Sequence, residues 1–565
     1  MNDQAIGMRG DESRQTPHSQ FAILNSQFWP LRDKGALSII ALFLLLLPIS
    51  LPRIYATDEV QYYAYLRSIY FDGDLDFRNE YEHFAEIGAR QNPPDLAIRN
   101  ALLDYDEQNP NPRTGKLRNV APIGSAIMWS PGFVLADLGV RIANGFGANI
   151  SADGYSRPYI WSVCFMSAFY ALGGLLLTYR LARRIAGAFA AALAAIAIWL
   201  ATPLVMYTFI LMPWSHAAGF FLFALFLTIW LGAGQTERQT SPNTPALLPS
   251  DPATRSPRAW VLLGVVGGMM TLTREQLGLF LLLPAIEGLL HYVNNIRGGR
   301  WDAARVLLAR HAVFLAAFAL MLVPQLATYQ VLNGRPLPSP TVGNKLVWCS
   351  PHFIDTLIDY DPRPSALCPI ADDPSARLAP FAHGAFLWSP ILVPALLGLL
   401  LLGRGASDLP TNDEGPRTNA SRLHRSPVVP DRASGAALLA ALLFMGFLVQ
   451  TYINGAFGTT WHLNRSFGFR RLIECTPIFV LGLAALIEWL RARGGRALPL
   501  LAAICLIYWN VGIIAQWTIV RPEIRNGLIW NGMLYNQFVR VPGAVVSKVD
   551  GVLFHRCQLA NNKTC

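Results

Sequence analysis

Long apolar segments alternate with short polar ones along almost the whole chain. An α-helix needs about 20 apolar residues to cross a hydrocarbon core. Eleven segments approach or reach this length, at 35–54, 158–181, 187–207, 212–231, 259–272, 275–292, 311–330, 381–402, 435–453, 472–490 and 497–520. The fifth is short and is followed by a break at 271–274, which a membrane helix tolerates where it lines a protein cavity. The pattern therefore predicts an all-α integral membrane protein with about 11 transmembrane helices.

Composition supports this prediction. Of 565 residues, 53% are hydrophobic and only 15% are charged, whereas soluble chains carry about 25% charged residues. The net charge of +10 does not indicate a nucleic-acid partner, because the arginines concentrate in short loops after every second apolar segment. Loops rich in Lys and Arg stay on the cytoplasmic side. The N-terminus is then expected in the cytoplasm and the C-terminus outside.

This topology divides the chain into a cytoplasmic tail (1–34), a transmembrane module (35–520) and an extracytoplasmic tail (521–565). Two large loops, 55–157 and 331–380, are expected outside. The first carries 14 acidic against 9 basic residues. Its apolar second half, from Val120 onwards, contains Pro122 and Pro131, so we expect interfacial helices there rather than a further span.

Cysteine positions leave the disulfides open. Cys349 and Cys368 share the second outer loop, and Cys557 and Cys565 share the tail. Either pair forms a disulfide only if its region faces an oxidising compartment and the geometry permits it. The other cysteines, Cys164, Cys475 and Cys505, lie in apolar segments and are expected in the core.

An acidic pair, Asp58 and Glu59, follows the first apolar segment directly. Adjacent helical positions point about 100° apart, so the two carboxylates have different surroundings. One is a candidate general base that faces a cavity, and its neighbour would orient the loop or hold a cation. Asp74 and Asp76 are secondary candidates for binding an acceptor or a metal. The alternative is an ordinary solvated helix end.

A cationic segment precedes the tenth apolar segment. It contains His462, Arg465, Arg470 and Arg471 among aromatic residues. Arginine binds phosphate through bidentate hydrogen bonds, so these arginines, together with Lys345 in the second outer loop, are candidate phosphate ligands. The alternative is a belt of interfacial aromatic and snorkelling basic side chains.

Further ionisable residues lie where helices are expected to meet the outer face: His216, Arg274 and His383. Such residues near membrane depth are candidates for a functional site. A lone histidine is more often structural, and Arg274 has an adjacent Glu275 with which it can pair inside the bundle. Both interpretations stay open.

The sequence lacks a Walker A motif, a dinucleotide fingerprint after a strand, GxSxG and HExxH. No cytoplasmic domain is large enough to bind ATP or a nucleotide sugar. A donor used on the outer face would therefore have to arrive attached to a carrier that the membrane holds.

Seven motifs in order resemble the GT-C superfamily of polytopic glycosyltransferases, notably bacterial relatives of protein O-mannosyltransferases and lipid A aminoarabinose transferases. They are TDEVQYYAY, GDLDF, NVAPIGSAIMWSPG, LMPWSHAAGFF, LTREQ, HGAFLWSP and SFGFRRL. The resemblance implies a polyprenyl-phosphate sugar as donor and a first outer loop with the catalytic acid. Asp58 matches that acidic position and Glu59 its neighbour, while the long insertion between GDLDF and APIG departs from the aminoarabinose enzymes.

We therefore expect a hexosyl- or pentosyltransferase of the bacterial inner membrane. It would move a monosaccharide, with inversion, from polyprenyl phosphate to a lipid, glycan or protein acceptor on the extracytoplasmic face. No cofactor is certain, and a divalent cation (Mg²⁺ or Mn²⁺) held by Glu59, Asp74 and Asp76 stays open. A flippase or transporter for lipid-linked saccharides is the alternative, and a non-catalytic assembly subunit is a third reading.

Overall fold

The computed structural model describes part of the chain. The described residues are 33–554 apart from 92–93, 110, 233–251, 253–254, 340–345, 359–382, 405–431, 458–459, 464, 521–523, 525–527 and 529. Within them the chain is helical, and the β-structure there is one isolated bridge between Leu346 and Phe457. The predicted all-α class is therefore confirmed for these residues.

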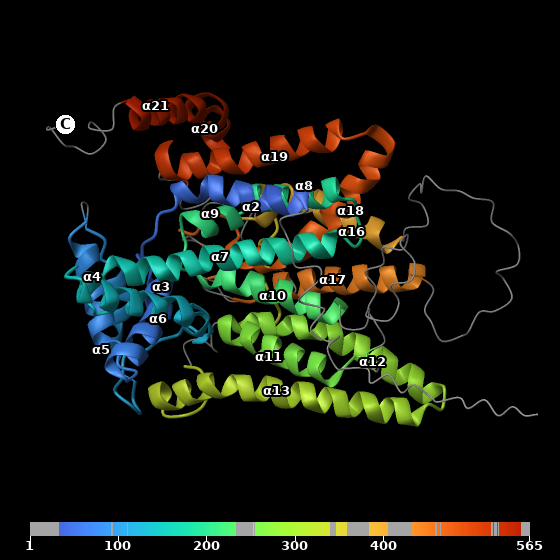
Figure 1. Ribbon diagram of the computed structural model, residues 1–565, viewed down its shortest axis with the longest axis horizontal. Helices are drawn as coiled ribbons and strands as arrows, with labels where there is room; N and C mark the ends of the chain where they lie inside the picture. The colour runs from blue at the N-terminus through green and yellow to red at the C-terminus, as the bar shows by residue number, and fades with distance from the viewer. Residues whose placement is uncertain are drawn as a thin grey trace, which may run out of the picture.

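The helices form a bundle with a smaller helical group at one end (Figure 1). The bundle consists of α2 (Lys34–Leu46), α7 (Arg157–Ala182), α8 (Ala188–Leu200), α9 (Leu204–Phe209), α10 (Ser215–Gly232), α11 (Pro257–Thr273), α12 (Leu282–Arg297), α13 (Trp301–Asn333), α15 (Ala385–Trp388), α16 (Leu392–Gly403), α17 (Arg432–Gly455), α18 (Thr476–Gly494) and α19 (Ala497–Ala515). The end group consists of α3 (Thr57–Arg67), α4 (Arg78–Ala89), α5 (Tyr105–Gln108) and α6 (Gly124–Gly145). The helices α20 (Trp530–Tyr535) and α21 (Val541–Phe554) lie beside α19.

Eight helices in the described residues are long and apolar enough to cross a membrane, and three further apolar helices are shorter. The chain is thus a multi-pass membrane protein, but the exact number of 11 spans stays a prediction. Two expected spans are interrupted: Pro203 lies between α8 and α9, and Pro390 between α15 and α16. Proline removes a helical hydrogen bond and displaces the preceding turn. The helix α6, expected at the interface, is one of the eight.

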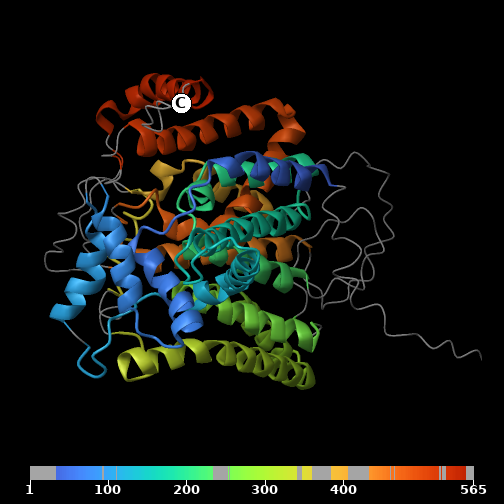
Figure 2. The same ribbon diagram turned by 60° about the vertical axis from the view of Figure 1, so that its left-hand side comes forward.

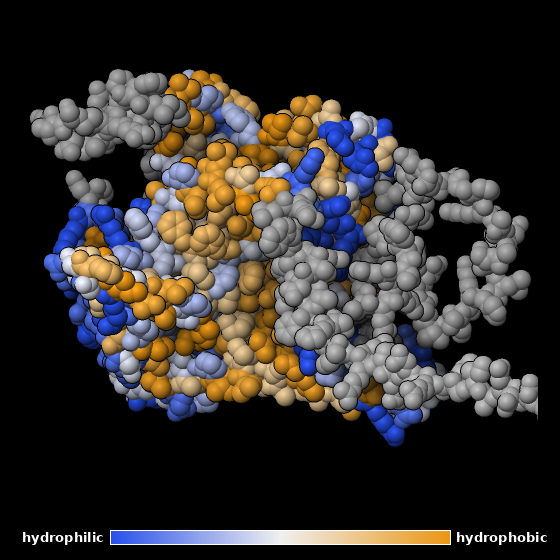
Figure 3. Space-filling view, in the orientation of Figure 1, coloured by the Kyte–Doolittle hydropathy of each residue, from blue (hydrophilic) through white to orange (hydrophobic). Residues whose placement is uncertain are grey.

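The surface matches a membrane environment. Apolar side chains cover the middle of the face shown in Figure 3, and hydrophilic ones gather over the end group and again toward the opposite end of the bundle. The helix α13 lies at the perimeter in Figures 1 and 2. In its most apolar stretch of 18 residues, only 6% of the residues are buried. Leu308, Leu315 and Leu320 on it are exposed, as expected of side chains that contact lipid.

Glycines let two bundle helices approach closely. A Cβ atom on Gly398 of α16 would lie 1.9 Å from the carbonyl oxygen of Gly482 on α18. A Cβ atom on Gly482 would lie 2.0 Å from the carbonyl oxygen of Ala395. Small residues at a crossing permit backbone contact between membrane helices, so this crossing requires glycine on both helices.

Gly124 positions the end group against the bundle. A Cβ atom there would lie 2.3 Å from the backbone carbon of Leu272, near the end of α11. In addition, the Ile123 amide donates to Oε1 of Gln325 at 2.8 Å. The start of α6 is therefore fixed beside the point where α11 ends, and this brings the sequence motifs NVAPIG and LTREQ together.

The end group has its own charged centre at Arg67. Its guanidinium forms ion pairs with Asp72 and with Glu80, the latter at 2.9 Å. Nε donates to the carbonyl oxygen of Asp153 at 3.2 Å, and the group lies 4.6 Å from the ring centroid of Tyr155. This centre, defined by Arg67, Asp72 and Glu80, links α3, the turn after it, α4 and the segment before α7 within the end group.

The cysteines agree only in part with the expectations. Cys349 is disulfide-bonded, while the expected partner Cys368 and the tail cysteines Cys557 and Cys565 lie outside the described residues. Cys164 and Cys475 are free and buried, as expected, but Cys505 is exposed. The expectation for Cys505 was wrong because α19 lies at the edge of the bundle, where one face of an apolar helix remains uncovered.

Candidate active site

A cavity of about 510 Å³ lies where the end group meets the bundle. Elements distant in sequence form it: the start of α3, the break after α11, the end of α17 and the segment before α18. Its polar lining consists of Asp58, Gln61, Tyr62, Arg274, Glu275, Gln276, Thr460, His462, Ser466, Arg470 and Arg471. The lining thus holds three guanidinium groups against two carboxylates, and the structure brings together several predicted site residues.

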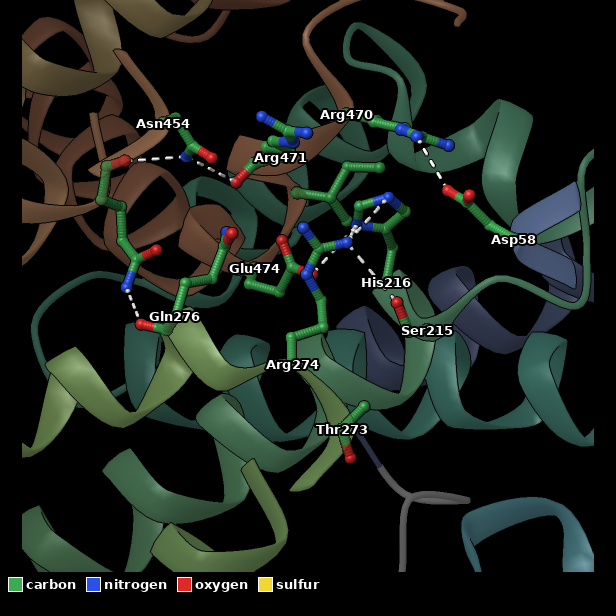
Figure 4. Close-up of polar contacts among 12 residues, drawn as sticks. Asp58, Ser215, His216, Thr273, Arg274, Gln276, Asn454, Arg470, Arg471 and Glu474 are labelled. Atoms are coloured by element: carbon green, nitrogen blue, oxygen red, sulfur yellow. Dashed lines mark hydrogen bonds and ion pairs between the residues drawn. The ribbon is translucent and has the colours of Figure 1, made fainter. Parts of the chain in front are cut away.

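Asp58 lies in the first turn of α3 and forms an ion pair with Arg470, 3.1 Å between Oδ2 and Nη2 (Figure 4). The Arg470 guanidinium also lies 3.9 Å from the ring centroid of Trp214. This stacking fixes the guanidinium, which in turn orients the carboxylate. The Asp58 side chain remains 43% exposed and lines the cavity. It is thus positioned but accessible, as a proton acceptor must be.

Arg471 differs from its neighbour. Its Nη2 donates to Oγ1 of Thr460 at 3.0 Å, and its guanidinium lies 4.7 Å from the ring centroid of Phe457. Its Nη1 is buried without a hydrogen-bond partner, and no carboxylate in the described part of the chain pairs with it. Burying an unpaired charge is costly, so Arg471 is the part of the cavity wall that most needs an anion.

Arg274 lines the cavity and forms a polar cluster with the buried residues Glu474 and His216 (Figure 4). Oε1 of Glu474 lies 2.9 Å from Nδ1 of His216 and 3.3 Å from Nε of Arg274. Arg274 Nη1 also lies 3.1 Å from His216 Nδ1 and 3.4 Å from the hydroxyl of Ser215. Ser215 donates to the Tyr62 hydroxyl at 3.1 Å. The predicted residues His216 and Arg274 thus contact each other, and Glu474 contacts both.

The helix α3 turns one face to the cavity. Asp58, Gln61 and Tyr62 all line it, because residues three and four positions apart lie on the same side of an α-helix. The Val120 amide donates to Oε1 of Gln61 at 2.8 Å, and Asn119 donates to the Gln61 carbonyl at 2.8 Å. These bonds fix the register of α3 against the segment before α6.

Glu59 does not face the cavity and is absent from its lining. Its Oε2 accepts hydrogen bonds from the Tyr55 and Ala56 amides, at 2.8 and 3.0 Å, and so caps the start of α3. The side chain is fully buried, and this burial raises the pKa of the Glu59 carboxyl to about 7. Of the two expected roles, orienting the loop fits this placement and holding a cation does not.

Asp74 and Asp76 lie outside the cavity. Oδ1 of Asp74 accepts from the Ser68 hydroxyl at 2.8 Å and from the Asp76 amide at 3.0 Å. The hydrogen bond from the Asp76 amide is the main cause that lowers the pKa of Asp74. The GDLDF motif thus forms a turn after α3, in which Asp74 and Asp76 have a local structural role, and their expected roles in acceptor or metal binding stay predictions.

The remaining predicted residues differ in their positions. Arg465 is exposed, has φ of +63° and does not line the cavity. Lys345 lies outside the described residues. His462 lines the cavity, whereas His383 is buried, stacks on Trp388 and contacts the carbonyl oxygen of Ser466 at 3.1 Å. His383 therefore packs the wall behind the cavity.

No group of three or more His, Cys, Asp and Glu side chains in the described residues is placed to hold a metal ion. The three residues suggested for a cation are not brought together, because Glu59 caps a helix and Asp74 and Asp76 form a turn.

Glu474 is one of the site residues that the sequence patterns did not indicate, as are Gln61, Tyr62 and Gln276. It lies at the end of SFGFRRLIE, directly before α18, and is 1% exposed. A carboxylate entering an apolar helix was itself a signal, because ionisable residues at this depth usually have a partner. Its partners, Arg274 and His216, are distant in sequence, so spacing alone did not indicate the cluster.

No family model matches the chain, and no curated protein matches it. Two solved structures are similar at 13% sequence identity. ArnT from Cupriavidus metallidurans, in a crystal structure bound to undecaprenyl phosphate, matches with a TM-score of 0.42 over 92% of this chain and 78% of that one. The oligosaccharyltransferase from Archaeoglobus fulgidus, in the apo form, matches with a TM-score of 0.43 over 87% of this chain and 58% of that one.

Proposed function

We propose that the chain is a membrane glycosyltransferase whose cavity binds a polyprenyl-phosphate monosaccharide and transfers the sugar, with inversion, to an acceptor hydroxyl. The acceptor belongs to a lipid, a glycan or a protein. The cavity faces the extracytoplasmic side of a bacterial inner membrane in this proposal, as the arginine-rich loops predict. Arg471, Arg470 and Arg274 contact the phosphate, and Asp58 accepts the proton.

The unpaired guanidinium of Arg471 carries this proposal. Arg470 has Asp58 as its counter-ion and Arg274 has Glu474, but Arg471 has only a hydroxyl and an aromatic ring among the described residues. The cavity therefore favours a ligand with negative charge next to Arg471. A phosphate accepts several charge-assisted hydrogen bonds at once, and neighbouring Arg470 and Arg274 provide further donors.

The proposed reaction is a single displacement. Asp58 takes the proton of the acceptor hydroxyl while the oxygen of that hydroxyl attacks the anomeric carbon. The bond between that carbon and the phosphate oxygen breaks, and its electron pair remains on the phosphate. Arg471 and Arg470 stabilise the charge that develops there, which is where electrostatic stabilisation lowers the barrier. Attack opposite the leaving phosphate inverts the anomeric centre.

Replacing Asp58 tests this mechanism. Asp58→Asn keeps the shape of the side chain but cannot take a proton, so the transfer rate should fall by about 100- to 10,000-fold. The measurement is sugar transfer in membranes supplied with lipid-linked sugars and cell-envelope acceptors, with protein amount followed in parallel. Asp76→Asn, an acid of the same loop outside the cavity, is the matched control and should retain activity. Near-normal transfer by Asp58→Asn would remove Asp58 as the base.

A further inference from the structure

The break after α11 presents three consecutive residues to the cavity: Arg274, Glu275 and Gln276. The helix ends at Thr273, Arg274 is extended with φ of −154° and ψ of 120°, and a 3₁₀ helix follows over Glu275–Leu281. Regular α-helical geometry would point consecutive side chains about 100° apart. The break instead brings all three side chains into the cavity lining. Of the three, only Arg274 is among the arginines proposed to contact the phosphate.

The carboxylate of Glu275 is accessible, and one of its two oxygens accepts a hydrogen bond from the protein. Its Oε1 accepts from the Tyr329 hydroxyl on α13 at 2.6 Å, and its side chain is exposed. Although it follows Arg274 in sequence, Arg274 pairs with Glu474 instead. No cation among the residues that the structure describes forms an ion pair with Glu275. The carboxylate thus keeps acceptor capacity that protein groups do not use.

Gln276 supplies a complementary donor. Its backbone carbonyl accepts from Nε2 of Gln450 at 2.9 Å, which fixes the 3₁₀ turn (Figure 4). Its own Nε2 is buried in the cavity wall and has no hydrogen-bond partner within the described ranges. An amide nitrogen offers two hydrogens, and an unused buried donor costs free energy. The side chain therefore favours a ligand with an acceptor oxygen.

We infer that Glu275 and Gln276 recognise hydroxyl groups of the transferred sugar. A sugar hydroxyl both donates and accepts hydrogen bonds, so one can donate to the Glu275 carboxylate while another accepts from the Gln276 amide. Both residues follow Arg274 directly, so a sugar esterified to a phosphate at the arginines lies beside them. This inference rests on the proposed function and adds to it: the arginines bind the phosphate, and the break selects a hydroxylated sugar.

The test compares a sugar-free ligand with sugar-bearing ones. Purified full-length protein is titrated with decaprenyl phosphate and with decaprenyl phosphate that carries glucose, mannose, galactose or arabinose. The wild-type protein should bind at least one sugar-bearing ligand more tightly than decaprenyl phosphate. Glu275→Gln and Gln276→Leu should each weaken that binding by about tenfold or more, the effect of losing a hydrogen bond to a charged or buried group. Neither should change the affinity for decaprenyl phosphate.

Tyr329→Phe separates recognition from anchoring. It removes the bond that holds Glu275 but leaves the carboxylate, so it should weaken sugar-dependent binding less than Glu275→Gln does. Equal effects of Tyr329→Phe and Glu275→Gln would overturn the inference, because Glu275 would then act only as an anchor for α13. It would also be overturned if the wild-type protein bound all ligands equally, or if Glu275→Gln weakened every ligand alike. Failure of the proposed function has a different signature, namely unchanged decaprenyl phosphate binding in Arg471→Met.

Discussion

Two arginines show how differently this chain uses a charge away from bulk water. Arg67, in the end group, meets two carboxylates, a carbonyl oxygen and an aromatic ring. Arg471, at the cavity, has one hydroxyl and one aromatic ring among its described neighbours. The centre at Arg67 is electrostatically complete, whereas Arg471 leaves a positive charge to be matched by a ligand.

The comparison separates structural from functional clusters. A cation whose partners all come from the fold stabilises that fold and gains nothing from a ligand. A cation without a counter-ion costs stability, and a site that binds substrate keeps such a group because the ligand supplies the missing charge. The same distinction applies to acids: Glu59 caps a helix in the interior, whereas Asp58 remains open to the cavity.

The largest effect is expected from Arg67→Met. This change leaves Glu80, which is fully buried, without its partner, and removing one member of a buried pair costs about 3–5 kcal/mol. Thermal unfolding in detergent measures the loss. Arg78→Met is the matched control: Arg78 pairs with Glu107 on the surface, with side chains 49% and 51% exposed, and such pairs contribute about 1 kcal/mol or less.

A second variant makes this prediction stricter. Arg67→Met combined with Glu80→Leu removes both charges, so it should recover part of the stability lost in Arg67→Met alone. Equal destabilisation by Arg67→Met and Arg78→Met would contradict the view that the Arg67 centre is structural.

A smaller effect is expected from the buried acid Glu59. Its pKa is raised by burial from 4.5 to about 7 in the folded protein. Between these pH values the folded chain holds a proton that the unfolded chain has lost, so the free energy of unfolding should fall as pH rises from 4.5 to 7. The fall attributable to Glu59 is about 3 kcal/mol at most.

Glu59→Gln is the test of this pH dependence. The glutamine oxygen can still cap α3 but does not titrate, so the variant should lose part of the slope of stability against pH. Unfolding temperatures at a series of pH values give the comparison. An unchanged slope in Glu59→Gln would show that the Glu59 carboxyl does not hold its proton in this pH range.

The smallest effect on stability is expected from Arg471→Met. The change removes a charge that has no carboxylate partner among the described residues and leaves no buried carboxylate behind. The free energy of unfolding should therefore stay within about 1 kcal/mol of the wild-type value or rise. A loss as large as that of Arg67→Met would show that Arg471 is a structural cation, and the contrast between the two arginines would disappear.

Much of the fold followed from the sequence because apolar length and helix breakers act locally. The break after α11, the acidic pair at the start of α3 and the arginines before α18 were all visible as patterns. The pairing of Arg274 with Glu474 was not, because it joins residues 200 positions apart through helix packing. The roles of Asp58 and Glu59 also required the structure, since only the first turn of α3 decides which carboxylate meets the Tyr55 and Ala56 amides.

The most direct measurement is the shift of the unfolding temperature by decaprenyl phosphate. A ligand that binds only the folded protein stabilises it by about 2.7 kcal/mol at 100 times its dissociation constant. We predict a clear upward shift for the wild-type protein and for Arg78→Met, and little or none for Arg471→Met at the same ligand concentration. A full shift in Arg471→Met would contradict the claim that the uncompensated arginine of the cavity binds the phosphate.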